Sequence, residues 1–127
     1  MEIYVEESFY NKNGYEKLLK AGTYKGCPYF IITFGTHPCC YIGIDSNNKF
    51  YKKHYDDIPI QVHGGLTFAC PTSKFKYFNK DNYWIIGWDY LHYGDYLYWL
   101  NYGKKWTLKE LEQAIYTAID NLIELNN

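Results

Sequence analysis

Two short segments of the chain combine glycines with side chains that can bind ligands or move protons. They read Val62-His-Gly-Gly-Leu-Thr67 and Gly87-Trp-Asp-Tyr-Leu-His-Tyr-Gly-Asp95. Each lies in or just after a stretch predicted to be an apolar strand, where a rigid sheet can present polar groups to a ligand. If the two strands are neighbours, these groups can converge on one pocket. The candidate ligand-binding residues are His63, Gly64, Gly65, Thr67, Trp88, Asp89, His92 and Asp95.

Three kinds of chemistry are open to these residues. In the first, a divalent metal is bound by Asp89, His92 and Asp95 together with His63, whose spacing is compatible with such a site. A bound metal can activate a water, but the other two interpretations do not require one. Alternatively, the two histidines form a general acid and base, with one aspartate orienting an imidazole. In the third interpretation no reaction occurs, because the glycine amides and histidines bind phosphate while an aromatic ring stacks on a base. The candidate rings are Trp84, Trp88 and Tyr90.

The same residues also have purely structural interpretations. A buried hydrogen bond between a histidine and an aspartate can simply hold a loop in place. The pair Gly64-Gly65 can form a β-bulge. His37 and His54 are expected to be solvated turn residues. Separately, the aromatic stretch 90–102 is a candidate protein-binding surface, because exposed tyrosine and tryptophan give contact area at low entropy cost.

Composition narrows the classes of protein. The 127 residues fit one domain, and 13 basic against 14 acidic residues argue against general nucleic-acid binding. The acidic N-terminus does not resemble a signal peptide, and no apolar run is long enough to span a membrane. We therefore expect a cytoplasmic protein, with a homo-oligomer left open. Reduced, mostly buried thiols are expected at the cysteines, which lack the spacing of a structural zinc site: Cys27, Cys39, Cys40 and Cys70.

Local patterns predict the elements that must position the candidate residues. Strands are expected at 3–5, 28–34, 40–44, 60–68 and 83–88. The second and third should form a hairpin, the fourth is interrupted by two glycines, and the last is the most apolar and should lie inside the sheet. A short helix is expected at 15–21, followed by Gly22 as its C-cap.

The clearest element is a long amphipathic helix at 107–126. Thr107 and Glu110 have the spacing of a capping box, and apolar residues then recur at helical intervals. Strands first and a helix last predict an α+β fold. We expect a single domain over 1–127, in which a mostly antiparallel twisted sheet within 1–106 packs against this C-terminal helix.

Five segments between residues 40 and 95 occur in an order that is similar to a known pattern. They are Cys40-Tyr-Ile-Gly-Ile44, Tyr55-Asp-Asp-Ile58, Val62-His-Gly-Gly-Leu-Thr-Phe68, Trp84-Ile-Ile-Gly-Trp-Asp89 and His92-Tyr-Gly-Asp95. The chain in this region resembles a family of small, mostly uncharacterised bacteriophage and prophage proteins with the motif V-H-G-G-L-T-[YF] followed by W-x-x-G-x-D-x-x-H-x-G-D. It departs at Tyr41, where the family often has Gly, and at Trp88, where Phe is usual. The tyrosine-rich stretch after Asp95 is not a family feature.

The resemblance implies a phage or prophage accessory protein without supplying a biochemical activity. Small phage proteins of this kind often oppose host defence, either by trapping or cleaving nucleotide signals or by blocking a defence protein. The leading hypothesis is a counter-defence protein that binds a small nucleotide-like ligand at the candidate residues. One alternative is a metal-dependent or histidine-based hydrolase of a phosphorylated small molecule. The other is a protein inhibitor of a host defence protein that acts through the Tyr- and Trp-rich surface.

Overall fold

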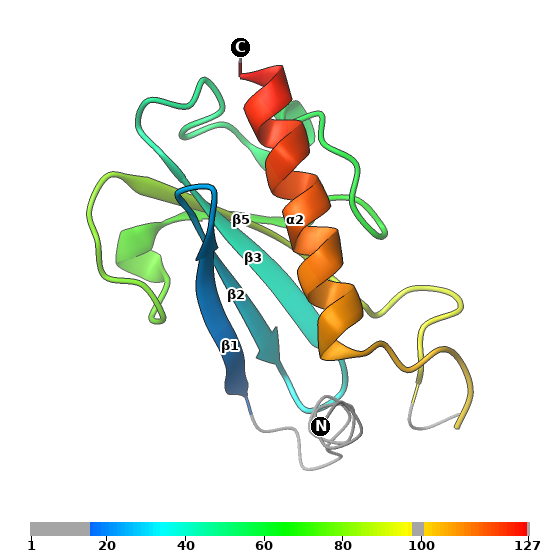
Figure 1. The fold of residues 1–127 in the computed structure, drawn as a ribbon. Coiled ribbons are helices and arrows are strands. Elements are labelled where there is room, and N and C mark those ends of the chain that lie inside the picture. Colours follow the sequence, from blue (N-terminus) through cyan, green and yellow to red (C-terminus); the bar gives the residue numbers. More distant parts are fainter. Residues whose placement is uncertain (1–15, 98–100, 127) are drawn as a thin grey trace.

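A five-stranded antiparallel sheet forms one layer of the protein, and a long helix lies across one of its faces (Figure 1). The structure is a computed structural model that describes residues 16–97 and 101–126. Its strands are β1 (Lys17–Tyr24), β2 (Cys27–Thr33), β3 (Pro38–Asp45), β4 (Phe68–Pro71) and β5 (Tyr83–Asp89). Their spatial order is β1-β2-β3-β5-β4, so β5 lies inside the sheet as expected. The predicted α+β arrangement is confirmed.

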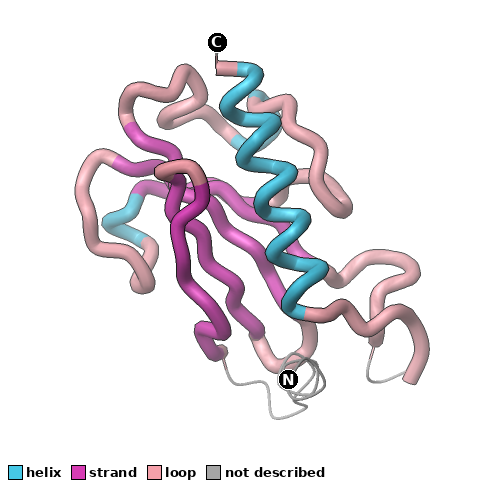
Figure 2. Tube along the Cα trace, in the orientation of Figure 1, coloured by secondary structure: helices cyan, strands magenta, loops and turns pink. Residues whose placement is uncertain are grey.

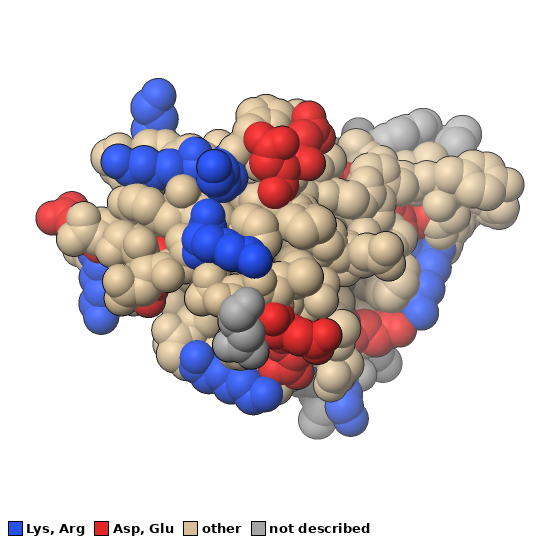
Figure 3. Space-filling model, turned by 90° about the horizontal axis from the view of Figure 1, so that it is seen from above, with Lys and Arg blue, Asp and Glu red and all other residues tan. Residues whose placement is uncertain are grey.

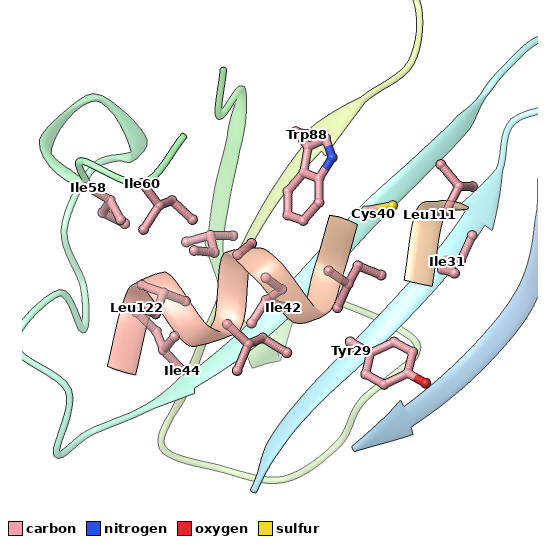
Figure 4. Close-up of a cluster of buried hydrophobic side chains, with 14 of the residues drawn as sticks. Tyr29, Ile31, Cys40, Ile42, Ile44, Ile58, Ile60, Trp88, Leu111 and Leu122 are labelled. Atoms are coloured by element: carbon pink, nitrogen blue, oxygen red, sulfur yellow. The ribbon is translucent and has the colours of Figure 1, made fainter. Parts of the chain in front are cut away.

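The helix α2 (Leu108–Leu125) begins at the predicted capping box. The Thr107 hydroxyl accepts from the backbone N–H of Glu110 at 3.2 Å, and the Glu110 carboxylate accepts from the backbone N–H of Thr107 at 3.0 Å. The buried stripe of the helix faces the sheet, where it meets side chains such as Ile42 and Trp88 (Figure 4). This stripe consists of Leu111, Ile115, Ala118, Ile119 and Leu122.

Side chains along the inner strands alternate between two apolar faces. On β3, Cys40 and Ile42 face α2, whereas Cys39 and Tyr41 belong to a second cluster on the opposite face. That second face is covered in part by the segment after β4, which contains the 3-10 helix η2 (Thr72–Lys74) and the buried Phe75. Because both faces are apolar, the inner strands read as nearly continuous hydrophobic runs.

The segment between β3 and β4 is loop, apart from the 3-10 helix η1 (Tyr55–Asp57) (Figure 2). We expected a strand over 60–68, and this was wrong, since only Phe68–Pro71 forms β4. The chain turns instead at Gly64, with the carbonyl of Val62 accepting from the backbone N–H of Gly65 at 2.9 Å. The two glycines therefore belong to a turn rather than to a β-bulge.

The predicted short helix at 15–21 is also wrong, because Lys17–Tyr24 is strand β1. A two-residue turn at Lys25 and Gly26, both with positive φ, joins β1 to β2 in a hairpin. Gly22 is not a cap but lies under the ring of Tyr29, where a β-carbon would come within 2.7 Å of that ring. Cross-strand pairing thus overrides local helix propensity. The strand expected at 3–5 lies outside the described residues.

Two ion pairs join the β1–β2 hairpin to α2. Lys25 lies 2.7 Å from Asp120, and Lys20 lies 2.5 Å from Glu112. The face seen from above carries both basic and acidic side chains (Figure 3). The two ion pairs therefore connect β1 and the turn after it to α2.

Candidate functional site

A buried carboxylate, that of Asp95, lies at the centre of the candidate site. Its residue is 1% exposed. One oxygen, Oδ2, lies 2.8 Å from Nε2 of His63 and accepts from the backbone N–H of His92 at 2.9 Å. The other, Oδ1, accepts from the indole N–H of Trp106 at 2.8 Å. The Asp95 side chain thereby connects three segments of the chain, those that contain His63, His92 and Trp106, through N–H donors that stabilise its carboxylate.

The imidazole of His63 is held between aromatic rings as well as by Asp95. It stacks on Tyr90, with the ring centroids 4.6 Å apart and the planes 9° from parallel. Trp106 meets it edge-on at 5.2 Å. Its side chain keeps 28% of its surface exposed. The ring is therefore fixed in position but still reaches the surface.

Gly64 lets the turn pass closely over the ring of His92. Its φ is +70°, and a β-carbon there would lie 2.3 Å from Nε2 of His92. That nitrogen is buried and lies 3.1 Å from Oδ1 of Asp89, although it makes no well-directed hydrogen bond within the described ranges. From the sequence we expected the glycine backbone to approach a ligand, but at Gly64 the group that it approaches is the imidazole of His92.

Asp89 has different surroundings from Asp95. Its Oδ1 accepts from the backbone N–H of Leu91 at 3.1 Å, and its Oδ2 accepts from the hydroxyl of Thr67 at 3.3 Å. Its side chain is 27% exposed. Because Asp89 follows Trp88 on β5, its side chain lies on the sheet face opposite the helix. The carboxylate remains open to solvent on that side.

The candidate residues are thus brought close together, because the His92 ring lies 3.1 Å from Oδ1 of Asp89 and 5.6 Å, between centroids, from the ring of His63, but the cluster opens on two different pockets. His63 lies on the helix side, whereas Thr67 and Asp89 line a pocket on the other side. Two of the candidate stacking rings were wrongly chosen, because Trp88 and Tyr90 are each 1% exposed and belong to the core. The third, Trp84, lies near the other end of β5 and donates its indole N–H to the carbonyl of Lys53.

The candidate metal ligands do not form a metal centre. Within residues 16–97 and 101–126, no group of three or more His, Cys, Asp or Glu side chains is arranged to hold a metal ion. The physical reason is that N–H donors already occupy both oxygens of Asp95, including Nε2 of His63. A divalent metal therefore has no preformed site among these residues.

The cysteines and His37 lie outside the Asp95 network. All four cysteines are free, and three are buried, as expected, with Cys27 partly so. Burial raises the pKa of the Cys39 thiol to about 12, which disfavours the thiolate needed for nucleophilic attack. His37, expected to be solvated, is instead half-buried, and desolvation lowers the pKa of its imidazole. His54 is exposed as expected, with 58% of its side-chain surface accessible.

A groove of about 510 Å³ runs beside His63, between the loop before the Gly64 turn and the first half of α2. We call it the helix-side groove. Of the candidate residues, only His63 and Trp88 line this groove. The residues on the flank of α2 were not predicted, although their spacing of three and four positions places them on one side of the helix. The groove is lined by Gln61, Val62, His63, Trp88, Trp106, Glu110, Gln113, Ala114 and Thr117.

The charges beside the helix-side groove are locally balanced. Lys104 lies 2.7 Å from the carboxylate of Glu110 and 4.3 Å from the ring centroid of Trp106. The hydrogen bond from Lys104, together with the capping contacts, lowers the pKa of Glu110. This carboxylate is therefore ionised at neutral pH and offsets the nearby ammonium charge.

Among the described residues, no helix is both long and apolar enough to cross a membrane. No family model matches the chain, and no curated protein and no solved structure matches it either.

Proposed function

We propose that the protein binds a small nucleotide-like ligand in the helix-side groove. The observation that carries this proposal is a groove of about 510 Å³ bordered by two fixed aromatic rings, His63 and Trp106. That volume falls in the range of about 300–1,000 Å³ typical of small-molecule sites. One face of His63 is stacked on Tyr90 and Lys104 lies over the ring of Trp106, so the ring surface that remains towards the groove is already held in place and needs little ordering when a ligand binds.

The other walls of the groove suit the edges of a heterocycle. Gln61 and Gln113 carry amides that both donate and accept, and Thr117 carries a hydroxyl. Because Glu110 offsets Lys104, the groove favours a ligand of low charge, in which the base and sugar dominate over the phosphates. This supports a nucleoside-like part in the groove, with any phosphate directed towards solvent.

The geometry favours binding over hydrolysis. A hydrolase needs a general acid and a general base that both reach the substrate. Asp95 binds Nε2 of His63, so only Nδ1 of that imidazole is left to act on a substrate, and the carboxylate of Glu110 is paired with Lys104. The carboxylate of Asp95 is buried and faces three donors, so it is not available to a substrate. We therefore propose that the protein binds its ligand without converting it. The resemblance to phage proteins adds a biological role to this proposal, in which the protein opposes host defence by sequestering a nucleotide signal.

Isothermal titration calorimetry with adenosine, AMP, ADP-ribose and a cyclic dinucleotide tests the proposal. We expect at least one probe to bind, and Thr117→Trp, which fills the groove, to weaken its affinity by at least about tenfold. Glu124→Trp is the matched control, because Glu124 lies two turns further along the same helix face and outside the groove. Binding of none of the probes, or equal affinity in Thr117→Trp, would refute the proposal. Chromatography of the recovered probe distinguishes a binder from a hydrolase, which would return a converted molecule.

Exposed aromatic side chains support one second candidate, a protein inhibitor of a host defence protein. Tyr93 is 98% exposed and Tyr102 is 61% exposed, and Leu91 beside them is 38% exposed. Large exposed rings are the residues that most often anchor protein interfaces. Trp99, in the same stretch, lies outside the described residues. This candidate predicts a stoichiometric host partner that co-purifies with Thr117→Trp but is lost from the double variant Tyr93→Ala/Tyr102→Ala, and the reverse pattern would count against it.

A further inference from the structure

A second pocket lies on the sheet face opposite α2, at the end of β5. Its volume is about 210 Å³, and its walls include Phe34, Tyr41, Phe68 and Asp89. We call it the opposite-face pocket. A neighbouring hollow of about 270 Å³ shares the same three aromatic residues. The pocket shares Trp88 with the helix-side groove but none of its other lining residues, and the proposed function uses neither these rings nor Asp89.

The aromatic wall depends on a missing side chain. Gly87 lies on β5 opposite Tyr41 on β3, and a β-carbon at Gly87 would come within 2.5 Å of the Tyr41 ring. The ring lies in that space and meets Phe68 edge-on, with centroids 5.3 Å apart and an interplanar angle of 83°. Phe34 and Phe68 are only half-buried, so part of their ring surface remains available. The wall of the pocket is thus formed by aromatic rather than aliphatic side chains.

Asp89 supplies the negative charge of this pocket. His92 and the backbone N–H of Leu91 lie against Oδ1, whereas the Oδ2 contact is the Thr67 hydroxyl at 3.3 Å. Desolvation lowers the pKa of the neighbouring His37, which is therefore uncharged at neutral pH and does not neutralise the carboxylate. In the neighbouring hollow, Lys76 is paired with Glu16 at 2.9 Å.

We propose that the opposite-face pocket binds an alkylammonium group. Oδ2 of Asp89 accepts one hydrogen bond, from Thr67, and its second lone pair can accept a charge-assisted hydrogen bond from an ammonium N–H. Aromatic rings attract the same cation through their quadrupoles. The volume of about 210 Å³ is below the range of sites for drug-sized molecules, so it suits a cationic head group with a short apolar chain. Free amines and lysine side chains both present this chemistry.

Titration of the ¹⁵N-labelled protein with n-butylammonium chloride, followed by amide chemical shifts, tests this proposal. We expect the signals of Thr67, Phe68 and Asp89 to move and n-butanol, the neutral analogue, to bind at least about fivefold more weakly. Affinity for n-butanol equal to that for n-butylammonium would overturn the proposal. N-acetyl-lysine methylamide distinguishes a lysine side chain from a free amine as the ligand. Binding as tight as that of n-butylammonium would show that the pocket accepts a lysine side chain, whereas much weaker binding would show that it accepts only free amines.

Matched variants separate this pocket from the rest of the molecule. Asp89→Asn keeps an acceptor for Leu91 but removes the charge, so we expect n-butylammonium affinity to fall about tenfold. Asp56→Asn, at an exposed carboxylate on η1, should leave affinity unchanged, as should Thr117→Trp in the helix-side groove. Phe34→Leu keeps apolar volume without the aromatic face and should weaken binding about threefold. Unchanged affinity in both Asp89→Asn and Phe34→Leu would overturn the assignment, independently of the outcome for nucleotides.

Discussion

Asp95 and Asp89 belong to one short motif, yet they lie in contrasting regions of the molecule. Asp95 is 1% exposed and accepts from donors of three segments, including the indole of Trp106. Asp89 has a 27% exposed side chain and lies on the rim of the opposite-face pocket. The contrast shows that neighbouring aspartates with equal spacing from a histidine can serve different purposes, one as a structural anchor and the other as an accessible charge.

The largest effect should follow from removing the anchor. Asp95→Ala leaves the N–H groups of His92 and Trp106 without their buried acceptor, so we expect the free energy of unfolding to fall by roughly 3 kcal/mol. Urea unfolding monitored by tryptophan fluorescence measures the change. A loss below about 1 kcal/mol would show that water replaces the carboxylate easily and that Asp95 is not an anchor.

The turn that covers His92 provides the next test. Gly64→Ala introduces both a left-handed φ for a residue with a side chain and a β-carbon 2.3 Å from the imidazole, so we expect a loss of about 2 kcal/mol. Gly65→Ala is the matched control, because its φ is +81° but no heavy atom lies within 4 Å of the added carbon. We expect it to cost only about 1 kcal/mol. Equal losses measured by urea unfolding would mean that the contact with His92 contributes nothing.

Removing the charge at the rim should affect stability less. Asp89→Asn retains an oxygen that accepts from Leu91, and the side chain is partly solvated, so we expect a loss of less than about 1 kcal/mol. The same urea experiment provides the measurement. A loss as large as that of Asp95→Ala would remove the distinction between anchor and accessible charge.

Much of the fold could be predicted from the sequence because its signals are local. The capping box at Thr107 and the apolar stripe of α2 depend on residues three and four positions apart. The hairpin of β2 and β3 was likewise marked by apolar runs around a turn. Strand β1 was missed because its structure depends on pairing with β2, and cross-strand pairing is not visible in a stretch read alone.

The candidate site was predicted as a set of residues but not as a geometry. The sequence pointed to His63, Asp89 and Asp95, but it could not show that strand alternation directs Asp89 to one face of the sheet while the loop that carries His63 lies beside the helix on the other. Trp106 was missed because its role depends on a contact with Asp95 across eleven positions. His37 was assigned to solvent because turn residues usually are, whereas here the second apolar face of the sheet shelters it.

The smallest expected effect is the pH dependence of stability that His37 contributes beside Asp89 in the opposite-face pocket. Because burial lowers the pKa of His37 in the folded protein, the unfolded chain binds more protons near its ordinary pKa. The contribution of His37 is therefore present above the unfolded pKa and is lost as the pH falls through the folded one. Urea unfolding at pH 7.5 and pH 5.5 should show lower stability at pH 5.5, and His37→Gln should reduce that difference, whereas His54→Gln, at an exposed position, should not. An unchanged difference in His37→Gln would mean that His37 is as well solvated when folded as when unfolded, which would remove the argument that His37 is uncharged beside Asp89 at neutral pH.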